Sequence, residues 1–326
     1  MLFSIFITIA SLAVAFAAPC TGGVAPTHGS AVRELFTFSN GTLLENIAVR
    51  SNGALLLTGL NRNKLVTLDP RARKPAARVL VEFDAKTANG ISGITEYAPD
   101  KFAFIAGQFN LTDFTTTGLA LWTVDLGRRG DVRPRRVAAL PKVGFGNGVA
   151  VAPGSRGLVV LADSKNSAIW SVDVTSGAVR EIANSAFTVA SAQGFPLGIN
   201  GIRTRGSDLF FVNTNARTVS KVAIRPDGTL GGKVTIVATT PADQTTFDDF
   251  ALDKQGRAWM ATVPNGIDVV LGNGKTVPIL GFNSGNTTGP TSAAFGRGSK
   301  SEENTLYVTT SFAKLFAIDT TKVKLT

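Results

Sequence analysis

The sequence has very few of the side chains that most often carry enzyme chemistry. Its 326 residues include one cysteine, Cys20, and one histidine, His28, and only 17% of the residues are charged. A single cysteine excludes an intramolecular disulfide. Catalysis by a nucleophile and a histidine needs an imidazole beside the nucleophile, and a lone histidine in a Gly/Thr/Ser-rich stretch is a poor candidate. A zinc site of histidines and cysteines is excluded too, so a metal ion here would have oxygen ligands, as calcium and magnesium do.

The residues that are abundant indicate a folded protein with many short strands. Hydrophobic residues make up 44% of the chain, which is too many for a disordered protein, and 34 glycines accompany frequent turn signals. The formal net charge is +10, with basic clusters at residues 71–74 and 128–136. Neither cluster lies in a nucleic-acid-binding motif with stacking aromatic residues, so we expect solvated loops and no nucleic acid partner.

The N-terminus has the pattern of a secretory signal. Residues 2–18 form an uncharged apolar run that is short for a membrane helix and ends in small residues. We expect residues 1–18 to be a cleaved signal peptide and 19–29 a tail; an uncleaved anchor is the alternative. The predicted location is the secretory pathway, secreted or vacuolar, without stable membrane insertion after cleavage. Three sequons for N-glycosylation fit this route: Asn40, Asn110 and Asn286.

One short unit recurs six times along the rest of the chain. Each copy starts with a polar residue, continues with apolar alternation, and is followed by further short strands, and the heads lie 43–55 residues apart. Four short antiparallel strands repeated six times predict an all-β fold, a six-bladed β-propeller, as one domain over residues 30–326. The sixth unit lacks its outer strand, but a matching segment, residues 32–38, precedes the first unit. We expect this N-terminal strand to complete the last blade and close the ring.

The residue at the head of each unit is predicted to face the central channel, because the innermost strand of a propeller blade runs along the axis. Residues of these types also favour strand starts and turns, which would explain them one by one. Two carboxylates and two carboxamides converging on one channel nevertheless predict a site, because close carboxylates either share a proton or hold a cation. The six heads are Glu45, Ser92, Asn147, Asn200, Asp248 and Thr291.

Phenylalanines lie in the segments that lead to several of these heads. Each could pack in the core, but as a set they predict an apolar funnel over a polar floor, which is the composition of a small-molecule pocket. We expect a small apolar molecule to contact them, together with Ser92 and Thr291. The four are Phe145, Phe195, Phe247 and Phe282.

These motifs resemble those of the SMP-30/gluconolactonase/LRE-like superfamily of six-bladed propellers. The match is best over residues 195–312, where NGI, DDFALDKQGRAWMAT, TSAAFG and LYVTT follow in the family's order. The resemblance implies a divalent ion held by Glu45, Asn200 and Asp248, with Asn147 as an auxiliary ligand. The family's segment that grips a sugar lactone has no clear counterpart here. The opening GTLLENIAVRSNGALLLTG resembles a fungal branch linked to secondary-metabolite biosynthesis, which includes hetero-Diels–Alderases.

Three functions are compatible with these observations. The first is a hetero-Diels–Alderase-like enzyme, which needs no cofactor: it would orient an apolar substrate, with Glu45 or Asp248 as general acid and Asn147 and Asn200 orienting oxygen atoms. The second is a lactonase or esterase that uses Ca²⁺ or another divalent cation at Glu45, Asn200 and Asp248. The third is a secreted propeller that binds a ligand without catalysis. The oligomeric state is not predicted by any of these patterns.

Overall fold

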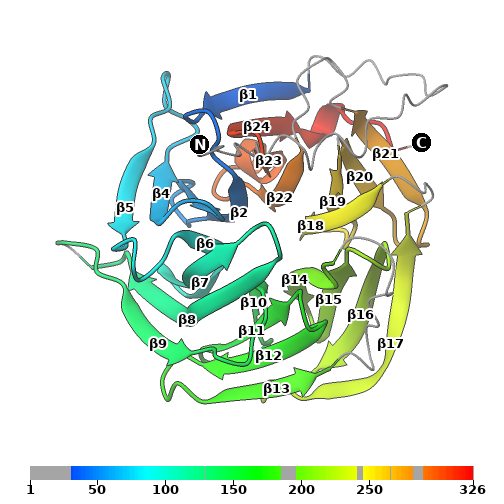
Figure 1. Cartoon of the computed structure of the whole chain (residues 1–326). Helices are drawn as coiled ribbons and strands as arrows, with labels where there is room; N and C mark the ends of the chain where they lie inside the picture. Colours follow the sequence, from blue (N-terminus) through cyan, green and yellow to red (C-terminus); the bar gives the residue numbers. More distant parts are fainter. Residues whose placement is uncertain are drawn as a thin grey trace, which may run out of the picture.

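Six antiparallel sheets of four strands make up the structure, which is a computed structural model. It describes residues 31–128, 130–184, 196–240, 245–264, 266–281 and 289–325. The sheets are arranged as blades around a central axis (Figure 1). The predicted six-bladed propeller is therefore confirmed.

The first five blades follow one another along the chain, each running from its inner to its outer strand. Blade 1 contains β2 (Leu44–Val49), β3 (Leu55–Gly59), β4 (Lys64–Leu68) and β5 (Arg78–Glu82). Blade 2 contains β6 (Gly90–Ala98), β7 (Lys101–Asn110), β8 (Thr115–Asp125) and β9 (Arg135–Ala139). Blade 3 contains β10 (Gly146–Val151), β11 (Leu158–Asp163), β12 (Ala168–Asp173) and β13 (Val179–Ala183). Blade 4 contains β14 (Ile199–Arg205), β15 (Asp208–Asn213), β16 (Thr218–Ile224) and β17 (Leu230–Thr239). Blade 5 contains β18 (Thr246–Leu252), β19 (Ala258–Val263), β20 (Gly266–Val270) and β21 (Thr276–Gly281).

The sixth blade joins the two ends of the described chain. It contains β22 (Pro290–Phe295), β23 (Thr305–Thr310) and β24 (Lys314–Asp319), and its outer strand is β1 (Val32–Thr37). β1 pairs antiparallel with β24, with Val32 opposite Ile318, and the two strands lie side by side in Figure 1. This is the predicted ring closure, and it pairs the outer edge of β24 with a strand from the other end of the chain.

The hydrophobic core lies between neighbouring blades. The strands alternate apolar residues that pack on the preceding blade with others that pack on the following one. Val149 belongs to a cluster with Ile105 of blade 2, whereas the next residue, Ala150, belongs to a cluster with Ile202 of blade 4. This packing fixes the inner strands around the axis and so positions the side chains at their heads.

The remaining regular structure is short. A single turn of helix, α2 (Lys300–Glu303), is capped by Ser299, and a 3₁₀ turn, η2 (Thr320–Lys322), follows β24. No helix in the described ranges has the length and apolar character needed to cross a bilayer. Asn40 and Asn110 are exposed, so glycosylation at these two sequons stays a prediction compatible with the fold. The predicted signal peptide, the tail up to residue 29 and Asn286 lie outside the described residues.

Candidate functional site

Every inner strand has a shift in its pairing with the next strand, at the place of the head residue. The shift changes the direction of the side chains there from that in a regular strand. In β2 the pairing with β3 shifts between Leu44 and Ile47, so Glu45 and Asn46 both fall in the shift. The inner strands of blades 2–5 have the same two-residue shift, and a shorter one in β22 falls at Thr291. Such bulges bend a strand and re-aim its side chains. All six predicted head residues therefore occupy equivalent places in the ring.

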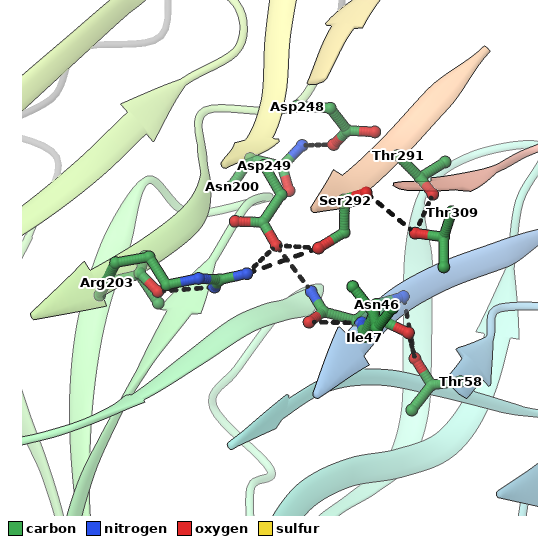
Figure 2. A network of polar contacts seen from close by, with 11 residues as sticks. Asn46, Ile47, Thr58, Asn200, Arg203, Asp248, Asp249, Thr291, Ser292 and Thr309 are labelled. Atoms are coloured by element: carbon green, nitrogen blue, oxygen red, sulfur yellow. Dashed lines mark hydrogen bonds and ion pairs between the residues drawn. The ribbon is translucent and has the colours of Figure 1, made fainter. Parts of the chain in front are cut away.

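The structure brings Glu45, Asn200 and Asp248 together. The Asn200 Nδ2 atom donates a hydrogen bond to Asp248 Oδ1 at 2.5 Å (Figure 2). It also donates to Thr214 Oγ1 at 3.0 Å. Glu45 is 5% exposed and Asn200 is 2% exposed, while Asp248 keeps more contact with solvent. Within the described residues, the Glu45 carboxyl has neither a hydrogen bond nor an ion pair, yet it lies close enough to Asp248 to interact electrostatically.

The two carboxyl groups are poised to hold a proton at neutral pH. Desolvation by burial raises the pKa of Asp248 to about 8; the Asp249 charge also raises it, and the Asn200 hydrogen bond opposes the increase. Burial likewise raises the pKa of Glu45 well above its ordinary value, and the neighbouring Asp248 and Asp249 charges add to this effect. Carboxyl groups that remain protonated in neutral solution can act as general acids.

The other predicted head residues lie in the same ring, and the hydroxyl groups of Ser92 and Thr291 have hydrogen-bond partners outside the set of six. The Ser92 hydroxyl donates to the Gly146 carbonyl at 2.9 Å, and the hydroxyls of Thr291 and Thr309 are 3.1 Å apart. Asn147 is 3% exposed at its bulge. Of the hydrogen bonds among the described side chains, only the one between Asn200 and Asp248 links two of the six heads.

The predicted apolar funnel is wrong for the two phenylalanines that the structure describes. Phe145 and Phe247 are both 0% exposed. Phe145 packs edge-on against Phe109, with ring centroids 5.4 Å apart, and Phe247 packs in a cluster with Phe250. Phe145 directly precedes β10, and Phe247 is the second residue of β18. At both places the ring is buried in the core between blades. Phe195 and Phe282 lie outside the described residues, so their predicted role is untested.

A second layer of polar residues lies at the same bulges, and sequence reasoning missed it. Asp249 Oδ2 accepts hydrogen bonds from Asn46 Nδ2 at 3.0 Å and Ser292 Oγ at 2.6 Å, and Arg203 Nη2 lies 2.5 Å from it (Figure 2). Asn46, Asp249 and Ser292 are each at most 2% exposed. Side chains from blades 1, 4, 5 and 6 therefore meet on one buried carboxylate.

The arrangement of Asn46 and Arg203 fixes this layer. Asn46 Oδ1 accepts a hydrogen bond from the Ile47 amide at 3.1 Å, which turns the Asn46 amide nitrogen towards Asp249. Arg203 also donates to the Ile202 carbonyl at 2.9 Å, and its guanidinium carbon lies 5.8 Å from the centroid of the Phe250 ring. The positive charge of Arg203 thus offsets the buried negative charge of Asp249.

A sequence signal for Arg203 does exist. It is the second residue after the bulge of β14, and the same place in the other inner strands holds a small residue. Those counterparts are Ala48, Thr95, Ala150, Ala251 and Ala294. A lone arginine in a series of small residues near the axis indicates a buried anionic partner.

The residues also fit a divalent ion in their chemistry. Glu45, Asp248 and the carboxamide oxygen of Asn200 are the hard oxygen donors that calcium takes. Asn200 Oδ1 is buried without a hydrogen-bond partner, as is Asp249 Oδ1. Among the described residues, no three Asp, Glu, His or Cys side chains form a group suited to a metal, so such a site would depend on the Asn200 oxygen.

Two cavities lie on the other face of the propeller, at the far ends of the inner strands. The larger has a volume of about 630 Å³ and is lined by residues of blades 2 and 3. The smaller, of about 280 Å³, is lined by the end of β6 and by the turns that follow β2, β6 and β22. Neither is lined by a predicted site residue, so the predicted axial substrate pocket stays a prediction.

Comparisons with known proteins support the resemblance seen in the sequence. Residues 184–312 match the model of the SMP-30/gluconolactonase/LRE-like region. A protein of Phoma sp, provisionally named a hetero-Diels–Alderase, is 29% identical over 322 residues, covering 87% of this chain and 89% of its own. A protein of Sarocladium schorii with the same provisional activity is 26% identical, covering 88% of this chain and 79% of its own.

A solved structure shares the fold. The calcium-binding protein regucalcin of Agrobacterium tumefaciens matches with a TM-score of 0.62 at 15% identity, covering 88% of this chain and 93% of its own. At this identity the likeness concerns the fold alone. The resemblance to SMP-30/gluconolactonase/LRE-like propellers and to proteins named hetero-Diels–Alderases is confirmed.

Proposed function

We propose that this protein is a hetero-Diels–Alderase-like enzyme that uses the axial carboxyl pair as its proton donor. The observation that carries the proposal is the buried pair Glu45 and Asp248, whose pKa values are both raised. The similarity to two proteins provisionally named for this activity, over 87–88% of the chain, supports it. A cycloaddition needs no covalent nucleophile, which agrees with a chain that has one histidine and one cysteine.

The proposed reaction has two steps, and protons balance in each. In the first, the protonated carboxyl donates its proton to a substrate hydroxyl, the C–O bond breaks and water leaves. A second proton passes from a phenol or enol oxygen of the substrate to the partner carboxylate, so the pair ends with one proton, as it began. The product is a reactive diene of the quinone methide type. In the second step, this diene adds to an alkene, forming one C–C and one C–O bond with no proton transfer.

The side chains beside the carboxyl pair would orient the substrate's oxygen atoms. Asn200 is itself held by Asp248 and Thr214, so its amide has one fixed orientation, and Asn147 occupies the equivalent bulge of the preceding blade. Holding two reactants in the reacting orientation lowers a barrier by up to about 7–11 kcal/mol in ideal cases. Positioned proton transfer adds about 10²–10⁴-fold.

A reaction with two simple substrates tests the acid role. An o-hydroxybenzyl alcohol and an electron-rich alkene are incubated with the protein, and the adduct is quantified together with its enantiomeric excess. Glu45→Gln is expected to slow adduct formation from the alcohol about 100-fold or more. When the quinone methide is instead generated by light, the variant should keep the stereoselectivity of the wild type.

The matched control is Glu82→Gln, which makes the same side-chain replacement at an exposed position in β5. It should react like the wild type. An unchanged rate of adduct formation in Glu45→Gln would show that Glu45 is not the acid. A racemic adduct with the wild-type protein would refute the proposal that the protein catalyses the cycloaddition.

A metal-dependent lactonase is the second candidate, because the buried Asn200 Oδ1 atom lacks a partner beside two carboxyls. A bound divalent ion would polarise a lactone carbonyl and lower the pKa of bound water. Calorimetric titration with Ca²⁺ and a lactone hydrolysis assay distinguish the candidates. Stoichiometric binding that is lost in Asp248→Asn, with hydrolysis that EDTA abolishes, would favour the lactonase over the cycloaddition.

A further inference from the structure

The larger cavity, on the face opposite the carboxyl pair, is a groove between blades 2 and 3. One wall is the end of β6, which includes Tyr97, with the turn to β7, and the other is the β10–β11 turn, which includes Arg156. Its volume of about 630 Å³ lies in the range of small-molecule sites. The groove therefore has the size of a ligand site but shares no residue with the axial one.

The groove carries an excess of positive charge. Lys101, Arg135 and Arg156 line it, and none of its lining residues is acidic. Lys101 has a carboxylate partner, Asp125, which lies 3.7 Å from its ammonium and is shared with Arg128 at 3.0 Å. The Asp173 carboxylate accepts a hydrogen bond from the backbone amide of Thr175, another lining residue, at 2.9 Å. Within the described residues, neither Arg135 nor Arg156 has a carboxylate partner. Guanidinium groups without a carboxylate partner bind phosphate or carboxylate oxygens through pairs of hydrogen bonds.

The local structure fixes the Arg135 side chain and the turn that carries Arg156. Arg135 Nη2 donates to the Val174 carbonyl at 2.8 Å, which fixes it across the blade junction. The turn that carries Arg156 is tightened by the Ser155 hydroxyl, which donates to the Ala152 carbonyl at 2.7 Å. Gly157 has a φ of 103°, and a Cβ atom there would lie 2.6 Å from Val174 Cγ2. Only glycine lets this turn pack so closely against Val174, which follows β12 of the same blade.

We propose that this groove binds an aromatic phosphate monoester. Three cations line the groove, and within the described residues only Lys101 has a carboxylate partner, which favours a doubly charged anion over a monoanion. The guanidinium groups of Arg135 and Arg156 take the phosphate oxygens, and the half-buried ring of Tyr97 provides an aromatic surface for a flat ligand. The groove is thus a second ligand site, independent of the reaction proposed at the axis.

Calorimetric titration of the intact protein tests this with three probes: phenyl phosphate, inorganic phosphate and benzyl alcohol. Phenyl phosphate is expected to bind with a dissociation constant below about 1 mM, and both other probes at least about tenfold more weakly. Arg156→Gln should weaken phenyl phosphate binding at least about tenfold. Arg156 is exposed, so this variant should unfold at the same temperature as the wild type.

The charge control is Arg73→Gln, which removes the same charge from an exposed loop of blade 1. It should change the affinity for phenyl phosphate less than about twofold. Equal weakening in both variants would mean that only the overall positive field attracts the probe, and the site would be refuted. Equal affinity for inorganic phosphate would overturn the aromatic part of the proposal, and absence of binding at millimolar phenyl phosphate would overturn all of it.

Discussion

Replacing Arg203 with methionine tests whether the second layer of polar residues holds the inner strands together. The Asp249 side chain is 3% exposed and would keep its hydrogen bonds from Asn46 and Ser292 but lose Arg203, its only cationic partner among the described residues. Methionine fills much of the space of the arginine stem without a charge. The variant therefore leaves a buried carboxylate uncompensated while changing the packing little.

The expected loss in free energy of unfolding follows from the burial of the pair. Removing one partner of a fully buried ion pair costs about 3–5 kcal/mol, whereas an exposed pair contributes about 0–1 kcal/mol. The Arg203 side chain is 20% exposed, and two hydrogen bonds to Asp249 remain. We therefore expect Arg203→Met to lower the free energy of unfolding by about 2–4 kcal/mol.

Urea unfolding followed by tryptophan fluorescence measures this loss, and a double-mutant cycle assigns it to the charge. Asp249→Asn keeps an oxygen acceptor for Asn46 and Ser292 but removes the buried charge. The double variant should therefore be more stable than Arg203→Met alone, with a coupling energy of at least about 1.5 kcal/mol. Arg205→Met, on the same strand but exposed, is the control and should cost under about 1 kcal/mol. A coupling energy near zero would refute the reasoning.

The remaining predictions concern the carboxyl pair and the close approach of the inner strands. The rate of adduct formation from the o-hydroxybenzyl alcohol should fall as pH rises through about 8, because the carboxyl pair loses its one proton as the pKa of Asp248 is passed; Asp248→Asn, which leaves no pair, should lack this step in its pH–rate profile. The raised pKa of Asp248 also makes the stability of the fold depend on pH. The contribution of the protonated Asp248 carboxyl to stability is complete below its ordinary pKa near 4 and is lost as pH rises through about 8. Urea unfolding midpoints measured across this pH range would show the loss. Gly93→Ala should destabilise the protein by at least about 2 kcal/mol, because its Cβ would lie 2.2 Å from the Asn147 carbonyl oxygen. Thermal unfolding checks this against Gly272→Ala, where no heavy atom lies within 4 Å of the new Cβ and little change is expected.

The sequence repeats were sufficient to predict the blades and the closure of the ring. Strand alternation separated by turns is a local pattern, and the missing outer strand of the sixth unit had one matching segment at the other end of the chain. The register of β1 with β24 confirms that match. The heads Glu45, Asn200 and Asp248 were predicted for the same reason, because equivalent places in equivalent blades converge on an axis.

The second polar layer could not be predicted from alternation alone. A regular strand directs every second residue to the same face, so a pattern with Asp248 facing the axis assigns Asp249 to the opposite side. The bulge breaks that rule and turns both residues inward. Position next to a head residue also led to the prediction of an apolar funnel. Phe145 and Phe247 lie next to head residues in the sequence, but in the structure both pack in the hydrophobic core between blades.

The second layer is also uneven around the axis, which explains why a carboxylate can be buried there. Blades 2, 3 and 4 have glycine at this place, whereas blades 5, 6 and 1 have Asp249, Ser292 and Asn46. A Cβ atom on Gly201 would come within 2.2 Å of Asp249 Oδ1, so Asp249 occupies space that a side chain on blade 4 would fill. The glycines bring the strands of one half together, and the polar side chains meet in the other half. Arg203, two residues after Gly201, reaches into that half because the glycine leaves room for the carboxylate it pairs with.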